Sequence, residues 1–373
     1  MMKIRALIAV FVGGIVTVQG GRALGALYTP GDLVVLQIGL TGSNTTLAST
    51  GTAVQLDEFT PGGSAVPGAT VLLPTASTGS NNPLTLSGTA GSEGALNLSA
   101  NGAYLVMGGY DVGVGGTTQG TSTVGLVDSS GNVDTSTTTT GLSGNNTRSA
   151  TSVDGSEVWV AGAAGVVAEA DGSSSGNMIA TRNIRAVGVA PASVSPTGSA
   201  QLYGSSNKSS LGISSIGNGT PTSGSAAVTV LNGMTSSNAP NSFGFFFANP
   251  TTMFVADGND GIQEWTLSGS TWSNPHTLAG SYIGITGSVS GNTVNLYYTT
   301  GVSTGWSSDN SLVSDTFNLS TGAFGTADTL ATATGDTGFS GVAFAPTPIP
   351  EPASATLLLL VGGGVLIRRR RAG

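Results

Sequence analysis

Short apolar segments alternate with turns that contain Gly or Asn through most of the chain. The clearest example is 99–109 (SANGAYLVMGG), and 152–162 (SVDGSEVWVAG) repeats it closely. Looser copies occupy 195–204, 248–258 and 288–298. Asn-Gly and Asp-Gly turns supply the positive φ angles that tight hairpins need, and the apolar residues after them suit a strand. The pattern predicts a repeated β-hairpin unit.

The spacing of these units indicates a β-propeller. Their turns recur about every 40–55 residues, which is the range of a four-stranded propeller blade. The five copies, an opening strand at 33–38 and a closing strand at 341–344 give about seven blades. Dividing a body of about 320 residues (26–346) by about 45 also gives about seven. We therefore expect an all-β, seven-bladed β-propeller, whose first and last strands can share one blade and so remove exposed sheet edges.

Two other all-β folds fit the composition. A parallel β-helix would show a shorter repeat of about 20 residues and more regular glycine spacing. A pair of β-sandwiches would need a linker near the middle of the chain. The segment 220–241 can serve as that linker, although long surface loops explain it equally well.

Charge is scarce and unevenly distributed. Only 8% of the 373 residues are charged, while glycine alone occupies 59 positions. Three of the 11 Lys and Arg residues lie near the N-terminus and four near the C-terminus, so 26–346 retains four. Because 18 of the 19 acidic residues also lie there, the body has a formal charge near −14. Such a surface repels phosphate backbones, so no nucleic-acid partner is expected.

The absence of cysteine limits the chemistry further. With no Cys in the sequence, disulfides, thiolate nucleophiles and Cys-based zinc sites are excluded. The apolar fraction of 39% is enough for a core that needs no covalent crosslinks.

The N-terminal segment 1–25 has the features of a signal peptide. Lys3 and Arg5 precede an apolar run at 6–18, and small residues follow it. Ala23 and Gly25 before Ala26 fit a small-x-small cleavage site. The alternative is a membrane anchor, but a run of about 13 residues is shorter than the ~20 that span a bilayer.

The C-terminal segment 347–373 has three parts in order. A Pro-rich stretch ending in Pro350, Glu351 and Pro352 is followed by the small apolar segment 353–367. The chain then carries four consecutive arginines, Arg368, Arg369, Arg370 and Arg371. Because cations beside an apolar helix stay on the cytoplasmic side, we expect a short transmembrane helix with the body outside the cytoplasmic membrane.

This order of motifs resembles the PEP-CTERM sorting signal of Gram-negative bacteria. The resemblance covers about the last 25 residues and concerns sorting, with no implication for the fold of the body. It implies recognition by the secretion machinery and by an exosortase, a membrane protease that cuts such tails near Pro-Glu-Pro. It also implies delivery to the cell envelope or the extracellular matrix, where proteins of this class often accompany polysaccharide. A plain anchor that is never cut is the alternative.

No catalytic constellation emerges from the sequence. His276 is the only histidine, and it lies in a turn-like segment where we expect it to be exposed. The carboxylates of Asp57 with Glu58, or Asp154 with Glu157, can be imagined as acid/base pairs for glycoside hydrolysis. Acids in turns of an acidic exported protein are more often simply solvated, so we expect no catalytic residues.

Two further features concern ligands. Asp257, Asn259 and Asp260 form an oxygen-rich loop that can hold Ca²⁺, but the twelfth position is Ser268 instead of the bidentate Glu of a calcium loop. A plain hairpin turn is the alternative, and no cofactor is otherwise expected. Trp272 and Trp306 lie in polar segments and are candidates for stacking on sugars.

The sequence therefore favours an exported protein with a structural or interaction role in the envelope or matrix. The alternative is a carbohydrate-active enzyme, a lyase or hydrolase on the same propeller. A third hypothesis is a low-complexity matrix filler with little fixed structure, which the 39% apolar fraction disfavours.

Overall fold

The computed structural model describes residues 26–43, 46–207, 209, 212–235, 237–301 and 310–349. These residues form 28 β-strands, and no α-helix occurs in this part of the chain. The predicted all-β fold is confirmed.

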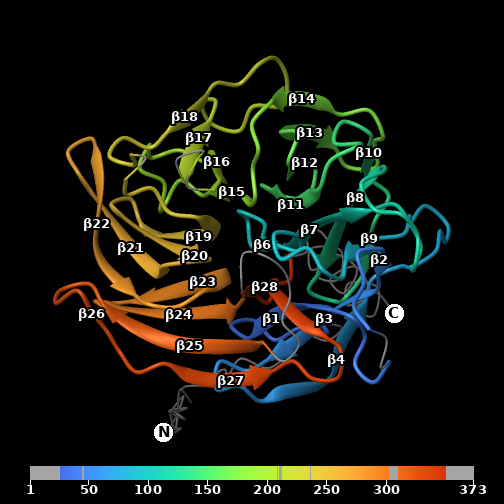
Figure 1. Ribbon diagram of the computed structural model, residues 1–373, viewed down its shortest axis with the longest axis horizontal. Coiled ribbons are helices and arrows are strands. Elements are labelled where there is room, and N and C mark those ends of the chain that lie inside the picture. Colours follow the sequence, from blue (N-terminus) through green and yellow to red (C-terminus); the bar gives the residue numbers. More distant parts are fainter. Residues whose placement is uncertain are drawn as a thin grey trace, which may run out of the picture.

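Six antiparallel sheets surround a common axis, with one strand of each sheet next to the axis (Figure 1). The protein is thus a β-propeller, and each sheet is one blade. The first three blades, from the innermost strand outward, contain these strands: β28 (Gly338–Phe344), β1 (Leu33–Ile38), β3 (Val54–Phe59) and β4 (Ala65–Leu72); then β6 (Leu96–Leu98), β7 (Tyr104–Tyr110) and β8 (Ser122–Asp128), with β9 (Val133–Asp134) and β10 (Thr138–Thr139) both on β8; then β11 (Thr147–Ser152), β12 (Glu157–Gly162), β13 (Val166–Ala170) and β14 (Asn177–Ala180).

The other three blades follow the same order around the ring. They contain β15 (Val187–Ala190), β16 (Gln201–Ser205), β17 (Ile213–Ile216) and β18 (Val228–Val230); then β19 (Ser242–Asn249), β20 (Thr252–Asp257), β21 (Gly261–Ser268) and β22 (Thr271–Leu278); then β23 (Tyr282–Ser290), β24 (Thr293–Thr300) and β25 (Ser311–Asn318), with β26 (Ala323–Phe324) and β27 (Asp328–Thr332) both on β25. A separate two-stranded sheet joins β2 (Gly51–Thr52) to β5 (Leu86–Ser87).

The predicted number of seven blades is wrong, because the two ends of the chain build one blade together. Strand β1 pairs with β28 from Leu33 opposite Phe344 to Ile38 opposite Gly338. The opening and closing strands, counted separately in the sequence, therefore belong to a single blade. This pairing closes the ring, because it joins a strand from the beginning of the chain to a strand from its end within one blade.

The five repeated segments form equivalent hairpins in blades 2 to 6. Each contains the turn between the innermost strand and the second strand of its blade. Gly102 and Gly155 occupy these turns with φ of 76° and 94°, which a residue with a Cβ adopts only with strain. Blade 1 has no sixth copy, because its two inner strands come from opposite ends of the chain and need no turn.

Apolar residues fill the six junctions between neighbouring blades, one cluster at each junction. Strand β12 shows how one sequence serves two junctions. Val158 and Val160 point toward blade 2, whereas Trp159 and Ala161 point toward blade 4. Because successive side chains alternate between faces, a strand buried on both faces must be apolar at nearly every position. This explains why the second strands read as continuous apolar runs.

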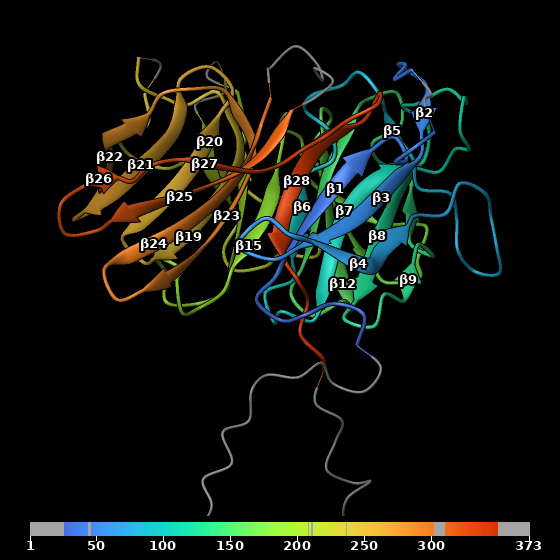
Figure 2. The same ribbon diagram turned by 90° about the horizontal axis from the view of Figure 1, so that it is seen from below.

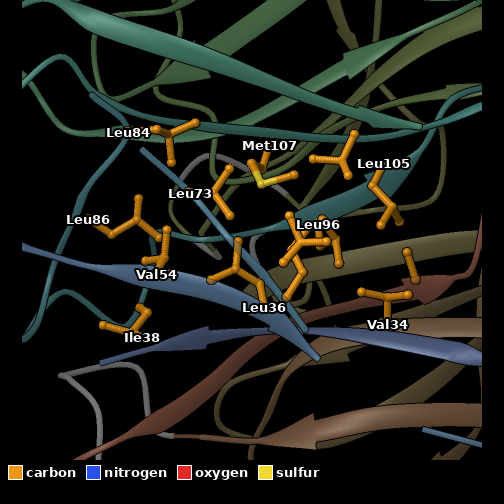
Figure 3. Close-up of a cluster of buried hydrophobic side chains, with 14 of the residues drawn as sticks. Val34, Leu36, Ile38, Val54, Leu73, Leu84, Leu86, Leu96, Leu105 and Met107 are labelled. Carbon is orange, nitrogen blue, oxygen red and sulfur yellow. The ribbon is translucent and has the colours of Figure 1, made fainter. Parts of the chain in front are cut away.

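The junction between blades 1 and 2 contains the largest of these clusters (Figure 3). Leu36 and Val54 from blade 1 face Leu105 and Met107 from blade 2, and none of the four exposes any surface. Burying a side chain of this size stabilises the fold by about 1.5–3 kcal/mol. The closure of the ring is thus supported by packing as well as by the β1–β28 pairing.

Close approach of the inner strands depends on glycine. A Cβ added at Gly341 of β28 would lie 2.2 Å from the backbone nitrogen of Leu96 in β6. A Cβ at Gly284 of β23 would lie 2.5 Å from the carbonyl oxygen of Ser340. At both positions a side chain would push neighbouring blades apart near the axis.

Both described ends of the chain lie on one face of the ring (Figure 2). Near the start, the Leu27 N–H donates to the carbonyl of Ser129 in the β8–β9 turn, at 2.8 Å. Near the end, the Thr347 N–H donates to the carbonyl of Gly102 in the β6–β7 turn, also at 2.8 Å. We call this side the tail face and the opposite side, where the innermost strands begin, the mouth face.

We expect Gly341→Ala to destabilise the protein by about 1–3 kcal/mol, because the added methyl group forces β28 away from β6. The measurement is chemical denaturation followed by tryptophan fluorescence. Gly120→Ala is the matched control, because nothing lies within 4 Å of a Cβ at that position. Equal stability of the two variants would show that the blades do not meet as closely as described.

Candidate functional site

A hollow lies on the axis at the mouth face, where the innermost strands begin. Its cavity volume is ≈40 Å³, which is room for a small polar group and far less than the about 300–1,000 Å³ of a pocket that encloses a whole ligand. Five blades contribute to its wall, and its functional side chains include Glu93, Asn97, Arg185 and Phe243. We call this hollow the channel mouth.

Two copies of an Asn-x-Arg sequence, 146–148 and 183–185, position the charges near the channel mouth. The first lies where β11 begins, and the second lies in the loop before β15. Nη1 of Arg148 donates to Oδ1 of Asn183 at 2.5 Å and to the carbonyl of Ile184 at 3.4 Å. The arginine of blade 3 thus holds the asparagine of blade 4.

The second arginine repeats this geometry one blade further. Nη1 of Arg185 donates to Oδ1 of Asn241 at 2.7 Å and to the carbonyl of Ser242 at 3.4 Å. In blade 5 the third position of the same sequence is Phe243, and the guanidinium carbon of Arg185 lies 4.1 Å from the centre of that ring. The stacking fixes the plane of the guanidinium group.

Burial lowers the pKa of both arginines. Burial, with repulsion from Arg148 next, lowers the pKa of Arg185 to about 10, while Asp257 opposes this change. Burial also lowers the pKa of Arg148, against the attraction of Glu93. Both groups still carry a full positive charge at neutral pH, and they lie close enough to repel each other.

Glu93 contributes a buried carboxylate beside these cations, with only 2% of its surface exposed. Its oxygens accept hydrogen bonds from the hydroxyl of Tyr110 at 2.6 Å, Nδ2 of Asn146 at 2.7 Å and the N–H of Ser87 at 3.0 Å. Burial raises the pKa of Glu93, and the three donors together with Arg148 oppose that rise. The hydrogen bonds of this carboxylate therefore connect blades 2 and 3.

Hydroxyl groups complete the connection around the axis. The Oγ of Ser340 donates to the Glu93 carbonyl at 2.8 Å, between blades 1 and 2. The Oγ1 of Thr299 donates to the Ser340 carbonyl at 2.5 Å, between blades 6 and 1. The Oγ of Ser281 donates to the Gly258 carbonyl at 2.6 Å, between blades 5 and 6. Every junction of the ring thus has a polar bond near the mouth face in addition to its apolar cluster.

A second hollow, with a cavity volume of ≈230 Å³, lies nearer the tail face, and most of the residues that line it are apolar. Asn97 contributes to both hollows. Its Nδ2 donates to the carbonyls of Ala150 at 2.7 Å and Val187 at 3.1 Å, so the side chain joins blades 2, 3 and 4. The polar chemistry of the axis is concentrated at the mouth.

The predicted sorting residues lie outside the described residues. These are Ala23 and Gly25 of the signal cleavage site, Pro350, Glu351 and Pro352, and Arg368, Arg369, Arg370 and Arg371. Ala26 is the first described residue. Among the residues that the structure does describe, no helix is long and apolar enough to cross a membrane.

The candidate calcium loop is a hairpin turn between β20 and β21. Oδ1 of Asp257 accepts the N–H groups of Asn259 at 2.7 Å and Asp260 at 2.9 Å. Its Oδ2 accepts the Asn241 N–H at 2.7 Å and Nε2 of Gln263 at 3.3 Å. The carboxylate is thus committed to N–H donors, and no group of three or more potential metal ligands occurs within the described ranges.

Trp272 is not a surface group, contrary to our expectation. Only 4% of its surface is exposed, and its ring packs edge-on against Phe247 with centroids 6.1 Å apart. The polar neighbours of Trp272 alternate with it along β22, so they face solvent while the indole fills the junction between blades 4 and 5. Trp306, the other candidate for sugar stacking, lies outside the described residues.

His276 also differs from the expected turn residue. It lies in β22, and its Nδ1 is 2.7 Å from Oε2 of the buried Glu264 on β21. The Asp57–Glu58 pair does not converge, because neighbouring residues of β3 point to opposite faces of the sheet. Asp154 closes its own turn by accepting the N–H and the Oγ of Ser156.

The sequence contained a signal for the channel mouth that we did not use. Three of the four basic residues of the body, Arg148, Arg182 and Arg185, lie within one short stretch of an otherwise acidic chain. The repeated Asn-x-Arg also precedes two of the predicted strands. What the sequence does not show is that successive copies contact each other across a blade junction.

No described protein family and no curated protein sequence matches the chain. Among the solved structures that are similar to the chain, two illustrate the low level of similarity. One is the dihydro-heme d1 dehydrogenase NirN, with 14% identity and a TM-score of 0.41 over 81% of this chain. The chain spans about half of that structure, since 54% of it is covered. The other is a putative TolB from Agrobacterium tumefaciens, with 12% identity, a TM-score of 0.40, and coverage of 85% of this chain and 99% of that one.

We expect Asn241→Ala to cost about 1–3 kcal/mol, because it removes the buried acceptor of the Arg185 guanidinium. Asn183→Ala removes the equivalent acceptor of Arg148, but Asn183 is exposed and water can replace it, so the cost should be about 0.5 kcal/mol or less. Urea denaturation of the two variants measures the difference. A larger loss of unfolding free energy in Asn183→Ala than in Asn241→Ala would contradict the assignment of Asn241 as the buried acceptor and Asn183 as the exposed one.

Proposed function

We propose that the protein is exported, is sorted through its C-terminal tail, and acts outside the cytoplasmic membrane as a binding propeller without catalytic activity. The tail with Pro350, Glu351 and Pro352 directs it to an exosortase-type protease and to the cell envelope or extracellular matrix. There the channel mouth contacts a partner, for which extracellular polysaccharide is the leading candidate.

The observation that carries this proposal is the position of the chain ends relative to the channel mouth. Strand β28 begins at the mouth face, crosses the ring and ends at the tail face, where Thr347 is bonded to Gly102. A tail that starts there leaves the molecule on the side opposite to the mouth. A propeller attached by this tail therefore presents the channel mouth away from its attachment point.

The bonding at the channel mouth supports binding in preference to catalysis. A general acid or base needs an oxygen or nitrogen that can reach the substrate. Both oxygens of Glu93 accept hydrogen bonds, Oε1 from Tyr110 and Asn146 and Oε2 from the Ser87 N–H. The Tyr110 hydroxyl is held between Glu93 and the Thr147 N–H. These groups hold the blades together, which leaves the arginines as the groups with donors to spare.

Deleting 350–373 should release the protein from the membrane fraction into the periplasm or the medium. Fractionation of the native host, followed by immunoblotting, measures this change. The control is the thermal transition of the truncated protein by circular dichroism, which should match that of the full chain because the described propeller is intact. If both forms fractionate identically, the tail is not a working sorting signal.

Incubation of the purified body, 26–349, with a panel of neutral and acidic polysaccharides should yield neither new reducing ends nor unsaturated products. Mass spectrometry of the products and a reducing-sugar assay measure turnover. Turnover that a single substitution such as Glu93→Gln abolishes would establish the rival function, a carbohydrate-active enzyme on the same ring.

A further inference from the structure

The channel mouth concentrates positive charge in a body that is otherwise strongly acidic. Of the four basic residues in 26–346, Arg185 lines the mouth, and Arg148, which does not line it, lies on the neighbouring blade close enough to repel Arg185. Among the described residues, no carboxylate oxygen lies within 4.0 Å of either guanidinium group. The two cations are neutralised at a distance only, by Glu93 and Asp257.

Both guanidinium groups also have hydrogen-bond donors left over. A guanidinium group has five N–H donors in a planar fork. Each of the two arginines makes its inter-blade bonds from Nη1 alone. The Nε of Arg148 is buried and has no partner. For Arg185, which lines the channel mouth, the unused Nε and Nη2 form the edge that binds a carboxylate through two parallel bonds.

The surroundings of Arg185 fix this edge in place. Its guanidinium lies against the ring of Phe243, and Nη1 is tied to Asn241 and Ser242 of the next blade. Such a group loses little freedom when a ligand binds, which favours affinity. Ser92 and Asn97 add a hydroxyl and an amide to the same wall, and these suit the hydroxyl groups of a sugar.

We propose that the channel mouth binds the carboxylate of a terminal acidic sugar of an extracellular polysaccharide, with Arg185 as the bidentate partner and Arg148 adding positive charge from the neighbouring blade. This inference rests on the proposed function and names its ligand class. The end of a polymer is favoured over its middle because the body has a formal charge near −14 and repels a long anionic chain. The carboxylate of a single terminal unit enters the mouth and meets Arg185, while the sugar rings stay outside it and the remaining chain points away from the protein.

The experiment is isothermal titration calorimetry of 26–349 with trigalacturonate as the probe, at about 0.1 M salt, where the Debye length is about 10 Å. The methyl ester of the same trimer removes the charge and leaves the sugar rings unchanged. We expect trigalacturonate to bind and the ester to bind at least about tenfold more weakly, as the loss of charge-assisted hydrogen bonds implies. Failure of trigalacturonate to bind, or equal binding of the ester, overturns the proposal.

Substitutions locate the site. Arg185→Gln should weaken trigalacturonate binding at least about tenfold, and Arg185→Lys should weaken it several-fold, because lysine keeps the charge but lacks the planar fork. Arg182→Gln is the matched control, since it makes the same charge change three residues away, in the wall of a different hollow. Thermal denaturation shows whether each variant is folded, and Arg185→Lys keeps the test valid if Arg185→Gln is not.

Two outcomes would contradict the location or the ligand. An equal loss in Arg182→Gln would indicate a general charge effect and would overturn the assignment to Arg185. Competition by acetate or inorganic sulfate at the same concentration as the trimer would indicate a site for free anions and would overturn the sugar ligand. Neither result would contradict the proposed export if deletion of the tail still changes the fractionation of the protein. The proposed function and the proposed ligand can therefore be refuted separately.

Discussion

Every blade of this ring must bury both of its faces, and the rest of the structure depends on that requirement. A single blade on its own would expose two apolar faces to water. Here six sheets lean on one another, and each junction has its own apolar cluster. No blade can be removed without exposing two of these clusters, so the stability of each sheet depends on closure of the whole ring.

Closure in turn determines where the ends of the chain lie. Because β28 is the innermost strand and β1 the second strand of the same blade, both ends must leave from the face where the innermost strands finish. The channel mouth lies at the other face, where those strands begin. The separation between the tail and the mouth is therefore a consequence of topology and needs no special loop or hinge.

The polar groups near the axis follow from the same geometry. Innermost strands converge there, so the donors and acceptors at their ends are removed from water and must find partners on the next blade. Arg148 and Arg185 satisfy the asparagine and carbonyl groups of the following blades, and Glu93 does the same with Asn146. The charged groups near the mouth thus help to hold the blades together. The N–H donors that they do not use between blades are the ones that we propose for the ligand.

The amino-acid sequence by itself determined the all-β class and the blade-like repeat, because these depend on local turn chemistry and on alternation along a strand. It also contains the ordered Pro-rich, apolar and Arg-rich segments from which we propose a sorting tail. Tertiary structure decided the number of blades, since only the pairing of Leu33 with Phe344 shows that two distant strands form one sheet. It likewise decided that Trp272 is internal and that Arg185 lines the mouth with Arg148 close by on the neighbouring blade, because both facts depend on how one blade lies against the next.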